Sequence, residues 1–158
     1  MDNFIFLKIL SDTDKIKVIG TNRKANFLYE ILNRYEAGLV LLGTEVKSLR
    51  ESKVNLQDAY ARFFGKELWL MNCHISEFTY GNINNHDPLR KRKLLFNKRE
   101  LKKIRAQLEE KGLTMVPTKI YFKGSIVKIE LAIARGKKMY DKRQSIKQRE
   151  TERKLKRI

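Results

Sequence analysis

The sequence has almost no cysteine or histidine. Cys73 is the single cysteine, and His74 and His86 are the only histidines among 158 residues. One cysteine excludes an internal disulfide framework and fits a reducing compartment such as the cytoplasm. A structural zinc site needs about four ligands, and Cys73 and His74 alternate across the expected strand, so their side chains point to opposite faces. We interpret Cys73 as a small buried hydrophobic residue and expect no metal and no cofactor.

Long apolar runs are also missing. No stretch approaches the ~20 apolar residues that span a bilayer, so we expect no membrane partner. The first 15 residues carry Asp2 before a short apolar run, Lys8 within it and no small-residue cleavage site after it. This pattern disfavours a signal peptide, and we interpret residues 1–15 as a leader of unknown role.

The motifs of common enzyme active sites are absent from the sequence. It has no phosphate-binding glycine loop of the Walker type, and the spacing of its acidic residues singles out no carboxylate pair. Glu36 stands beside Ala37 and Gly38 in an otherwise apolar segment. It is either a carboxylate at the rim of the fold that pairs with a lysine or a functional group. We therefore expect a protein without catalytic activity.

What the sequence does contain is positive charge. The chain has 35 lysine and arginine residues against 18 acidic ones, a formal net charge of +17 and an isoelectric point near 10.1. This excess favours a nucleic-acid partner over an anionic membrane. From Arg135 onward there are eleven basic residues and three acidic ones. Such a polar segment buries too little surface to offset its conformational entropy, so we expect a flexible, disordered basic tail at 136–158 in the free protein.

Between the leader and the tail, residues 16–135 read as one domain. We expect strands near residues 16–21, 35–42, 59–64, 68–75, 116–122 and 127–134, and helices at 23–32, 44–50 and 98–111. Asn22 and Asn97 are expected to cap the first and third helices. Gly65-Lys66 and Gly124-Ser125 are expected to be hairpin turns. Residues 78–93 are expected to form a long surface loop.

This order of elements predicts a fold that is mainly β with flanking helices. Many short antiparallel strands with helices at their ends are typical of a small barrel of the oligonucleotide-binding (OB) type. Basic residues interleaved with amides and aromatic rings are typical of RNA contact. They occur at Asn22, Arg23 and Lys24, and again in the polar and basic loop at residues 84–93.

Several strings are distinctive in combination. They are TNRKA at 21–25, YEAGLVLLGTEVKSLR at 35–50, KVNLQDAY at 53–60, NHDP at 85–88, RKLLFNKRE at 92–100, EKGLTMVPTKIYFK at 110–123 and ARGKKMYDKR at 134–143. The chain resembles, from about Val18 to its end, the bacterial family of SsrA-binding proteins, also called small protein B.

The resemblance implies an OB-type barrel that binds the tRNA-like part of transfer-messenger RNA (tmRNA) in trans-translation. It further implies that the basic tail enters the decoding region of a stalled ribosome and stands in for the missing codon–anticodon pairing. We accordingly expect a cytoplasmic monomer whose partners are this RNA and the ribosome. An enzyme acting on RNA, with Glu36 beside Asp58 or Asp87, and a structural ribosomal protein remain alternatives.

The resemblance also assigns residues to the two roles. It gives Asn22, Arg23, Lys24, Tyr29, Glu36, Asn85 and His86 as candidate RNA-binding residues, and the basic end of the loop at residues 84–93 adds Arg92 and Lys93. The candidate ribosome-interacting tail residues are Gly136, Lys137, Lys138, Tyr140, Asp141, Lys142 and Arg143. The chain departs from the family's pattern at Phe27, where many relatives carry histidine, and at Tyr140, where some relatives do. An aromatic ring at either place can still stack on a base.

Overall fold

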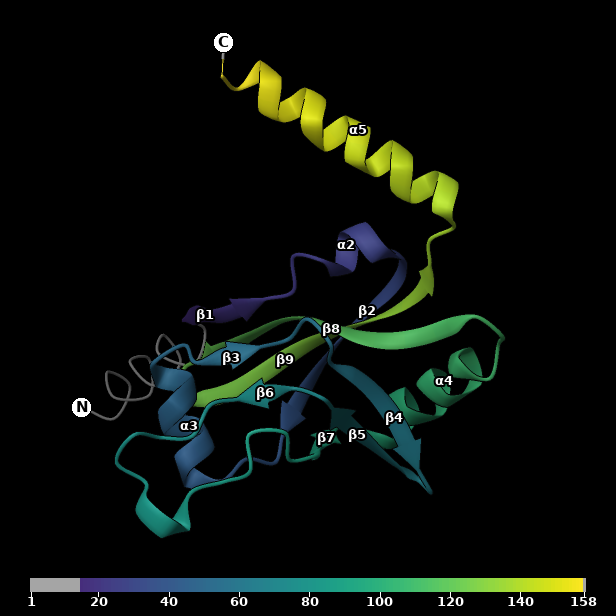
Figure 1. Ribbon diagram of the computed structural model, residues 1–158. Helices are drawn as coiled ribbons and strands as arrows, with labels where there is room; N and C mark the ends of the chain where they lie inside the picture. Colours follow the sequence, from purple (N-terminus) through teal and green to yellow (C-terminus); the bar gives the residue numbers. More distant parts are fainter. Residues whose placement is uncertain (1–14, 158) are drawn as a thin grey trace, which may run out of the picture.

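The structure is a computed structural model that describes residues 15–157 (Figure 1). Our interpretation of residues 1–15 as a leader lies outside the described residues, apart from Lys15. The strands are β1 (Ile16–Thr21), β2 (Tyr29–Leu39), β3 (Val54–Asn55), β4 (Tyr60–Phe64), β5 (Glu67–Met71), β6 (His74–Ile75), β7 (Arg92–Leu95), β8 (Leu113–Lys123) and β9 (Ile126–Gly136). The helices are α2 (Ala25–Leu28), α3 (Gly43–Arg50), α4 (Lys98–Leu108) and α5 (Met139–Leu155), with a 3-10 turn at Asn82–Asn84.

Six strands close into an antiparallel barrel. They follow the order β8-β4-β5-β7-β2-β9, and β9 pairs with β8 to complete the ring. Strand β1 adds to β8 outside this ring, and β3 and β6 form a separate two-stranded sheet. The architecture confirms the expected fold class, a mainly β protein with a small antiparallel barrel and flanking helices.

The barrel interior is filled by apolar side chains that alternate along the strands. In β9, Ile129, Leu131 and Ile133 are fully buried, and Leu70 joins them from β5. Helix α4 adds Ile104 to the same core. Alternation with period two is the pattern from which the strands were expected, because successive side chains of a strand point to opposite faces.

The expected capping of α4 is confirmed. The Asn97 side chain accepts a hydrogen bond of 2.9 Å from the Glu100 N–H, and the helix begins at Lys98. It ends at Leu108, three residues before the expected end at Lys111, and Gly112 then takes a φ of +82°. A positive φ is easily adopted by glycine, so the chain turns there into β8.

The helix expected at residues 23–32 is wrong. Helix α2 has only four residues, and the chain enters β2 at Tyr29. Tyr29 pairs with Gly136, and Ile31 pairs with Ala134 across β9. Tertiary pairing therefore overrides the helical spacing of the apolar residues, and it does so at residues whose aromatic or β-branched side chains favour strands.

The expectation of a disordered tail is also corrected. Helix α5 spans 17 residues, and none of them is buried. Its composition explains why a helix forms, because lysine, arginine, glutamine and glutamate lose little side-chain freedom in helices. The Ser145 hydroxyl also donates to the Asp141 carbonyl one turn earlier, at 2.9 Å. The tail is helical, but it lacks the packed apolar face that stabilises most protein helices.

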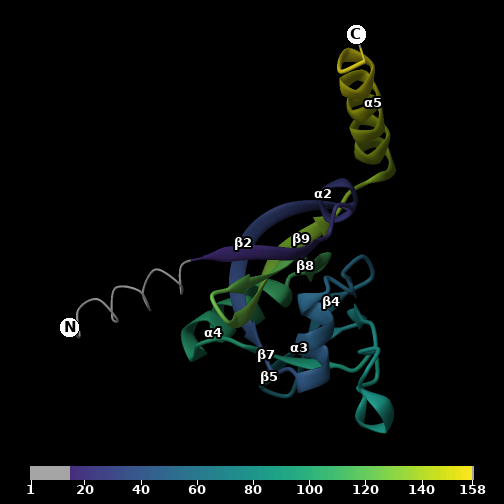
Figure 2. The same ribbon diagram turned by 90° about the vertical axis from the view of Figure 1, so that its left-hand side faces the viewer.

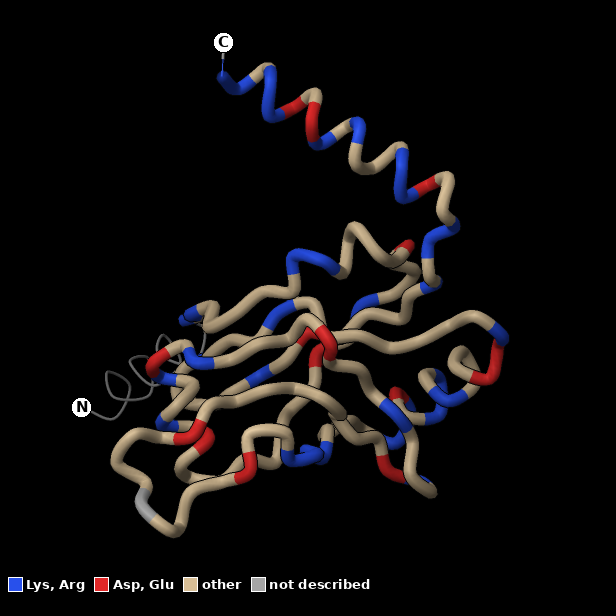
Figure 3. Tube along the Cα trace, in the orientation of Figure 1, with Lys and Arg blue, Asp and Glu red and all other residues tan. Residues whose placement is uncertain are grey.

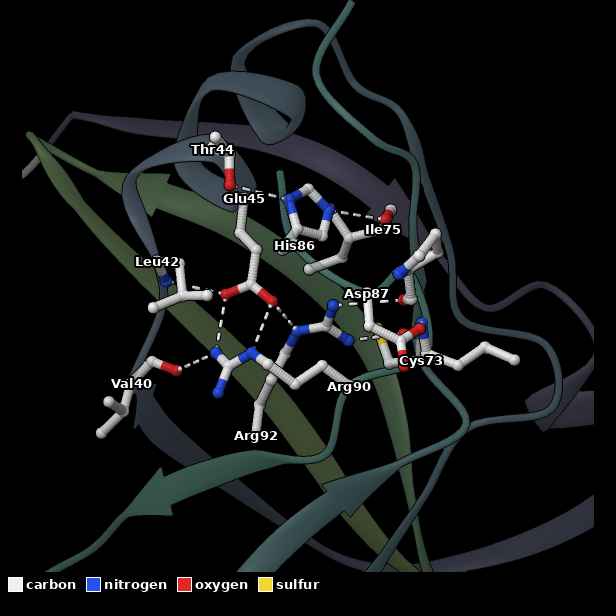
Figure 4. A network of polar contacts seen from close by, with 12 residues as sticks. Val40, Leu42, Thr44, Glu45, Cys73, Ile75, His86, Asp87, Arg90 and Arg92 are labelled. Carbon is white, nitrogen blue, oxygen red and sulfur yellow. Dashed lines mark hydrogen bonds and ion pairs between the residues drawn. The ribbon is translucent and has the colours of Figure 1, made fainter. Parts of the chain in front are cut away.

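A buried carboxylate organises the loop before β7 (Figure 4). Glu45 is fully buried, and it accepts hydrogen bonds from the Leu42 N–H at 2.8 Å, from Arg90 at 2.8 and 3.0 Å, and from Arg92 at 2.8 Å. Burial by itself raises the pKa of the Glu45 carboxyl, but the bonds from Arg90 and Leu42 and the charge of Arg92 outweigh it and hold the pKa below 4.5. Helix α3 and the β7 segment are thereby joined.

Two expected RNA contacts belong to this buried region instead. Arg92 has no exposed surface, and its Nη1 donates to the Cys73 carbonyl at 2.6 Å. The His86 ring is 3% exposed and lies between the Thr44 hydroxyl and the Ile75 carbonyl, 2.9 Å from each. The assignment of Arg92 and His86 to RNA binding is corrected, because their polar atoms are occupied inside the fold.

Cys73 is confirmed as a buried hydrophobic residue. Burial raises the pKa of its thiol to about 11, against the lowering effect of the nearby Arg92 charge. Such a thiol is almost entirely protonated at neutral pH and is therefore a poor nucleophile. No helix within residues 15–157 is long and apolar enough to cross a membrane.

The buried ion pair makes a stability prediction. Replacing Glu45 by glutamine leaves Arg92 charged and without its anionic partner, so we expect the free energy of unfolding at pH 7 to fall by about 3–5 kcal/mol. Urea titration measures this loss. Glu51→Gln is the matched control, because Glu51 follows the same helix but forms an exposed ion pair with Lys53 and should cost less than about 1 kcal/mol.

The same pair predicts a pH dependence. The folded-state pKa of Glu45 lies below its ordinary value of 4.5, so its stabilising effect is complete above that pH and is lost as the pH falls through the depressed folded value. The difference in stability between the native chain and Glu45→Gln should therefore shrink in acid. Equal effects of Glu45→Gln and Glu51→Gln at pH 7 would contradict the role of the buried network.

Candidate nucleic-acid interface

The turn between β1 and α2 presents two exposed cations. Arg23 and Lys24 are exposed, whereas the Asn22 side chain before them is 6% exposed. The Asn22 amide nitrogen donates to the Leu56 carbonyl at 3.2 Å and to the Pro117 carbonyl at 3.0 Å. Asn22 therefore does not cap a helix but fastens the turn to the barrel, so that Arg23 and Lys24 project into solvent.

Tyr29 holds a defined place at the start of β2. It is partly buried against a small cluster formed by Ala25, Val116 and Ala134, and Tyr60 packs against the same cluster. One side of the Tyr29 ring is thus fixed by packing while part of it remains accessible. A ring held in this way loses little conformational freedom when it stacks on a base.

Glu36 lies on the outward face of β2 with its side chain 42% exposed. The Tyr121 hydroxyl donates a hydrogen bond to its carboxylate, and Lys123 Nζ lies 3.7 Å from its other oxygen. Burial and the Glu36 charge both raise the pKa of Tyr121, so its hydroxyl stays protonated. The pairing with a lysine that we considered for Glu36 is therefore present, yet the carboxylate still reaches solvent.

Glu130 stands directly opposite Glu36 on β9. It accepts hydrogen bonds from the Thr118 hydroxyl at 2.7 Å and from Arg34 at 2.9 Å, and Lys119 lies 3.5 Å away. Burial raises the pKa of Glu130, but Thr118 and the two cations more than compensate and lower it. This face of β2, β8 and β9 therefore carries two carboxylates, each with hydrogen-bond and cationic partners.

The loop at residues 78–91 is braced from within. The Asn85 amide nitrogen donates to the Phe78 carbonyl at 2.6 Å, and its oxygen accepts from the Phe78 N–H at 3.1 Å. Asn85 is therefore a structural residue of the loop. Lys93, at the start of β7, forms a 2.8 Å ion pair with Glu67 and stays partly exposed.

The tail joins the barrel close to α2 (Figure 2). The Lys137 N–H donates to the Leu28 carbonyl, and its ammonium donates to the Asn26 carbonyl, both at 2.9 Å. Further along α5, the Arg149 guanidinium lies 4.8 Å from the centre of the Phe27 ring. These contacts place the tail beside α2, the short helix that directly follows Arg23 and Lys24.

Both the turn before α2 and the tail carry clustered lysine and arginine residues (Figure 3). Basic residues recur along α5 and directly precede α2. Among the tail residues, Lys138, Tyr140, Asp141 and Arg143 are exposed, and Gly136 ends β9. The candidate residues brought together are therefore the turn, Tyr29 and the first residues of the tail. Glu36 lies further along β2.

Sequence reasoning missed the partners of Glu36 and the contact between Arg149 and Phe27. Lys119, Tyr121 and Lys123 alternate along β8, so their spacing could have shown that they share one face of that strand. Local spacing does not reveal which strand lies beside them, because strand pairing is decided by the tertiary fold. Within residues 15–157, no three histidine, cysteine or acidic side chains gather as a metal site.

Comparison with known proteins places the chain in a family. The family model described as SmpB protein matches residues 19–158. The SsrA-binding protein of Thermosynechococcus vestitus is 57% identical over 145 residues, covering 91% of this chain and 95% of that protein. The SsrA-binding protein of Limosilactobacillus fermentum is 53% identical over 141 residues, covering 89% and 90% respectively.

A solved structure agrees with these relatives. A chain described as "tmRNA-SmpB: a journey to the center of the bacterial ribosome" shares the fold with a TM-score of 0.66 and 47% sequence identity, over 80% of this chain and 93% of that chain. The family match covers almost all of the described residues, including the turn, the barrel and the tail. The chain belongs to the SmpB protein family.

Proposed function

We propose that this protein is an RNA-binding adaptor that binds the tRNA-like part of tmRNA and delivers it to stalled ribosomes for trans-translation. The observation that carries this proposal is the 57% sequence identity, over 91% of this chain, to a protein named for SsrA binding. A structurally similar chain whose description names tmRNA, SmpB and the ribosome supports it. The protein contributes recognition and placement, without a catalytic step of its own, and acts as a monomer in the cytoplasm.

The barrel supplies the RNA-binding surface. Arg23 and Lys24 neutralise phosphates, while the partly fixed ring of Tyr29 stacks on an unpaired base of the folded RNA. Folded RNA is read at such loops because side chains cannot enter its deep major groove. Asn22 supports this surface from within, whereas Asn85 braces the separate loop at residues 78–91. Lys93 is a further RNA-binding cation apart from this surface, on β7 at the opposite end of the barrel from α2.

Glu36 has a separate role. Phosphates repel a carboxylate, so its favourable partner is the amino edge of a base. The Tyr121 hydroxyl and the Lys123 ammonium orient the Glu36 carboxylate before RNA arrives. An oriented acceptor loses less conformational freedom on binding and discriminates better between base edges.

The tail supplies the ribosome-binding part. The tail at 136–158 has ten basic and three acidic residues, and its helix α5 has no buried residue, so it can leave the barrel without exposing a core. We propose that it is held loosely in the free protein and enters the decoding region once the RNA has docked, in place of a codon. The tail residues assigned to this role are Gly136, Lys137, Lys138, Tyr140, Asp141, Lys142 and Arg143.

Replacing Glu36 by alanine tests the base contact. We expect the free energy of binding to the isolated tRNA-like RNA to weaken by about 1–3 kcal/mol, the usual effect of losing a base contact. Titration at constant salt concentration measures it. Glu51→Ala is the matched control, because this exposed glutamate lies at the end of α3 and should leave affinity unchanged or slightly higher. Equal affinities of the two variants would contradict the assigned contact.

Ending the chain after Gly136 tests the division of roles. The barrel should fold, because β9 is complete at Gly136 and α5 contributes nothing to the core. We expect affinity for the isolated tRNA-like RNA to stay within about threefold, whereas peptide tagging on stalled ribosomes should be lost. A shortened chain that loses most of its affinity for the isolated RNA would overturn the division.

A further inference from the structure

The outward face of β4, β5 and β7 carries an unusual set of residues. Inward positions of these strands are apolar, such as Ala61, Leu68 and Leu70, all of them buried. The outward positions alternate with them. The side chains that define what we call the β4–β5 outer face are Arg62, Phe64, Trp69, Lys91 and Lys93.

Strand pairing brings these residues together. Arg62 on β4 stands directly opposite Trp69 on β5, and Trp69 stands opposite Lys93 on β7. Lys91 immediately precedes β7. A single continuous surface across three strands therefore results, built from residues that are up to 31 positions apart in sequence.

Cations and rings alternate across this face. The Arg62 guanidinium lies 5.5 Å from the centre of the Phe64 ring, and Lys91 Nζ lies 5.1 Å from it. Lys91 Nζ is also 5.9 Å from the Trp69 ring centre. Phe64 remains 40% exposed. The rings are thus held in place by neighbouring cations while retaining open surface.

The chemistry of this face fits unpaired RNA. Flat rings can stack on any base, because each base has an aromatic face, and nearby cations can neutralise the phosphates that connect successive bases. The one carboxylate among these positions, Glu67, is paired with Lys93 at 2.8 Å, so positive charge remains in excess. This charge favours a polyanion over an apolar protein surface.

The face lies away from the surfaces already described. Figures 1 and 2 place β5 and β7 at the opposite end of the barrel from α2 and α5. A partner bound there leaves the Arg23–Lys24 turn and the tail accessible. Resting on the proposed function, we propose that the β4–β5 outer face binds an unpaired segment of ribosomal RNA while the protein carries its tmRNA on the other surface.

The sequence provides a direct reporter for this contact. Trp69 is the only tryptophan in the chain, so all tryptophan fluorescence originates on the proposed surface. Stacking of a base on or beside its ring should quench the emission. We expect a saturable quench when the full-length protein is titrated with an unpaired 12-nucleotide RNA of mixed sequence, and a curve that weakens with added salt.

Two variants test whether the quench arises at this surface. Phe64→Leu removes the ring but keeps apolar volume, and Lys91→Gln removes the cation between the rings. Each should weaken the apparent affinity about tenfold, the scale of one lost stacking contact. Lys103→Gln, at an exposed lysine of α4, is the matched control and should leave the curve unchanged. Urea unfolding midpoints verify that the variants fold.

A second measurement identifies the source of the RNA. Phe64→Leu and Lys91→Gln should bind the isolated tRNA-like RNA within twofold of the native protein, yet their complexes should bind stalled ribosomes about tenfold more weakly. Unchanged Trp69 emission, or ribosome binding equal to the native protein, would overturn the proposal. Loss of affinity for the tRNA-like RNA instead would overturn its assignment to the ribosome. If the native protein itself failed to bind the tRNA-like RNA, the proposed function would fail separately.

Discussion

Strand β9 is the constraint on which the structure depends. Along one edge it pairs with β2 from Tyr29 to Gly38, and along the other it pairs with β8 from Leu113 to Lys123. These two ladders close the barrel and bury Ile129, Leu131 and Ile133 in its centre. They also bring α2 and the tail together, because β2 begins directly after α2 and β9 ends where the tail begins. Helix α2 and the tail are neighbours for this reason.

Positive charge has two distinct uses in this molecule. Arg92 is buried and paired with Glu45, and two further N–H groups of its guanidinium donate to the backbone carbonyls of Cys73 and Pro88. Removing water from two buried charges costs nearly as much free energy as their attraction provides, so the ion pair adds little net stability. Its main effect is to hold α3 and the β7 segment in one arrangement. Arg23, Lys24 and the α5 cations lie on the surface, where they attract a polyanion without a desolvation cost of that size.

Sequence patterns correctly predicted the elements that depend on neighbouring residues, namely strands with alternating apolar side chains and a helix with a side-chain cap. Alternating apolar residues marked β4, β5, β8 and β9, and Asn97 marked the start of α4. The segment at 23–32 was misassigned because helical spacing there competes with pairing to β9, a contact more than 100 residues away in sequence. A strand partner of that kind leaves no local signature.

The candidate site shows the same limit. Arg23 and Lys24 could be identified as exposed cations, because both were expected at the exposed start of a helix directly after the first strand. His86 and Arg92 were assigned to RNA because both lie in a polar, basic loop, and sequence spacing cannot reveal the buried acceptor Glu45, 47 residues away from Arg92. The outward set on β4, β5 and β7 was missed for a related reason, since its residues become one surface only when three strands pair.

The most direct test of the account is native-state hydrogen exchange of the free protein. The account predicts that amides of β9 between Ile129 and Ile133 exchange only through global unfolding, because both edges of this strand are paired and its core side chains are buried. Amides of α5 should exchange orders of magnitude faster, because that helix buries no residue. Protection of α5 equal to that of β9 would contradict a closed barrel with a separable tail.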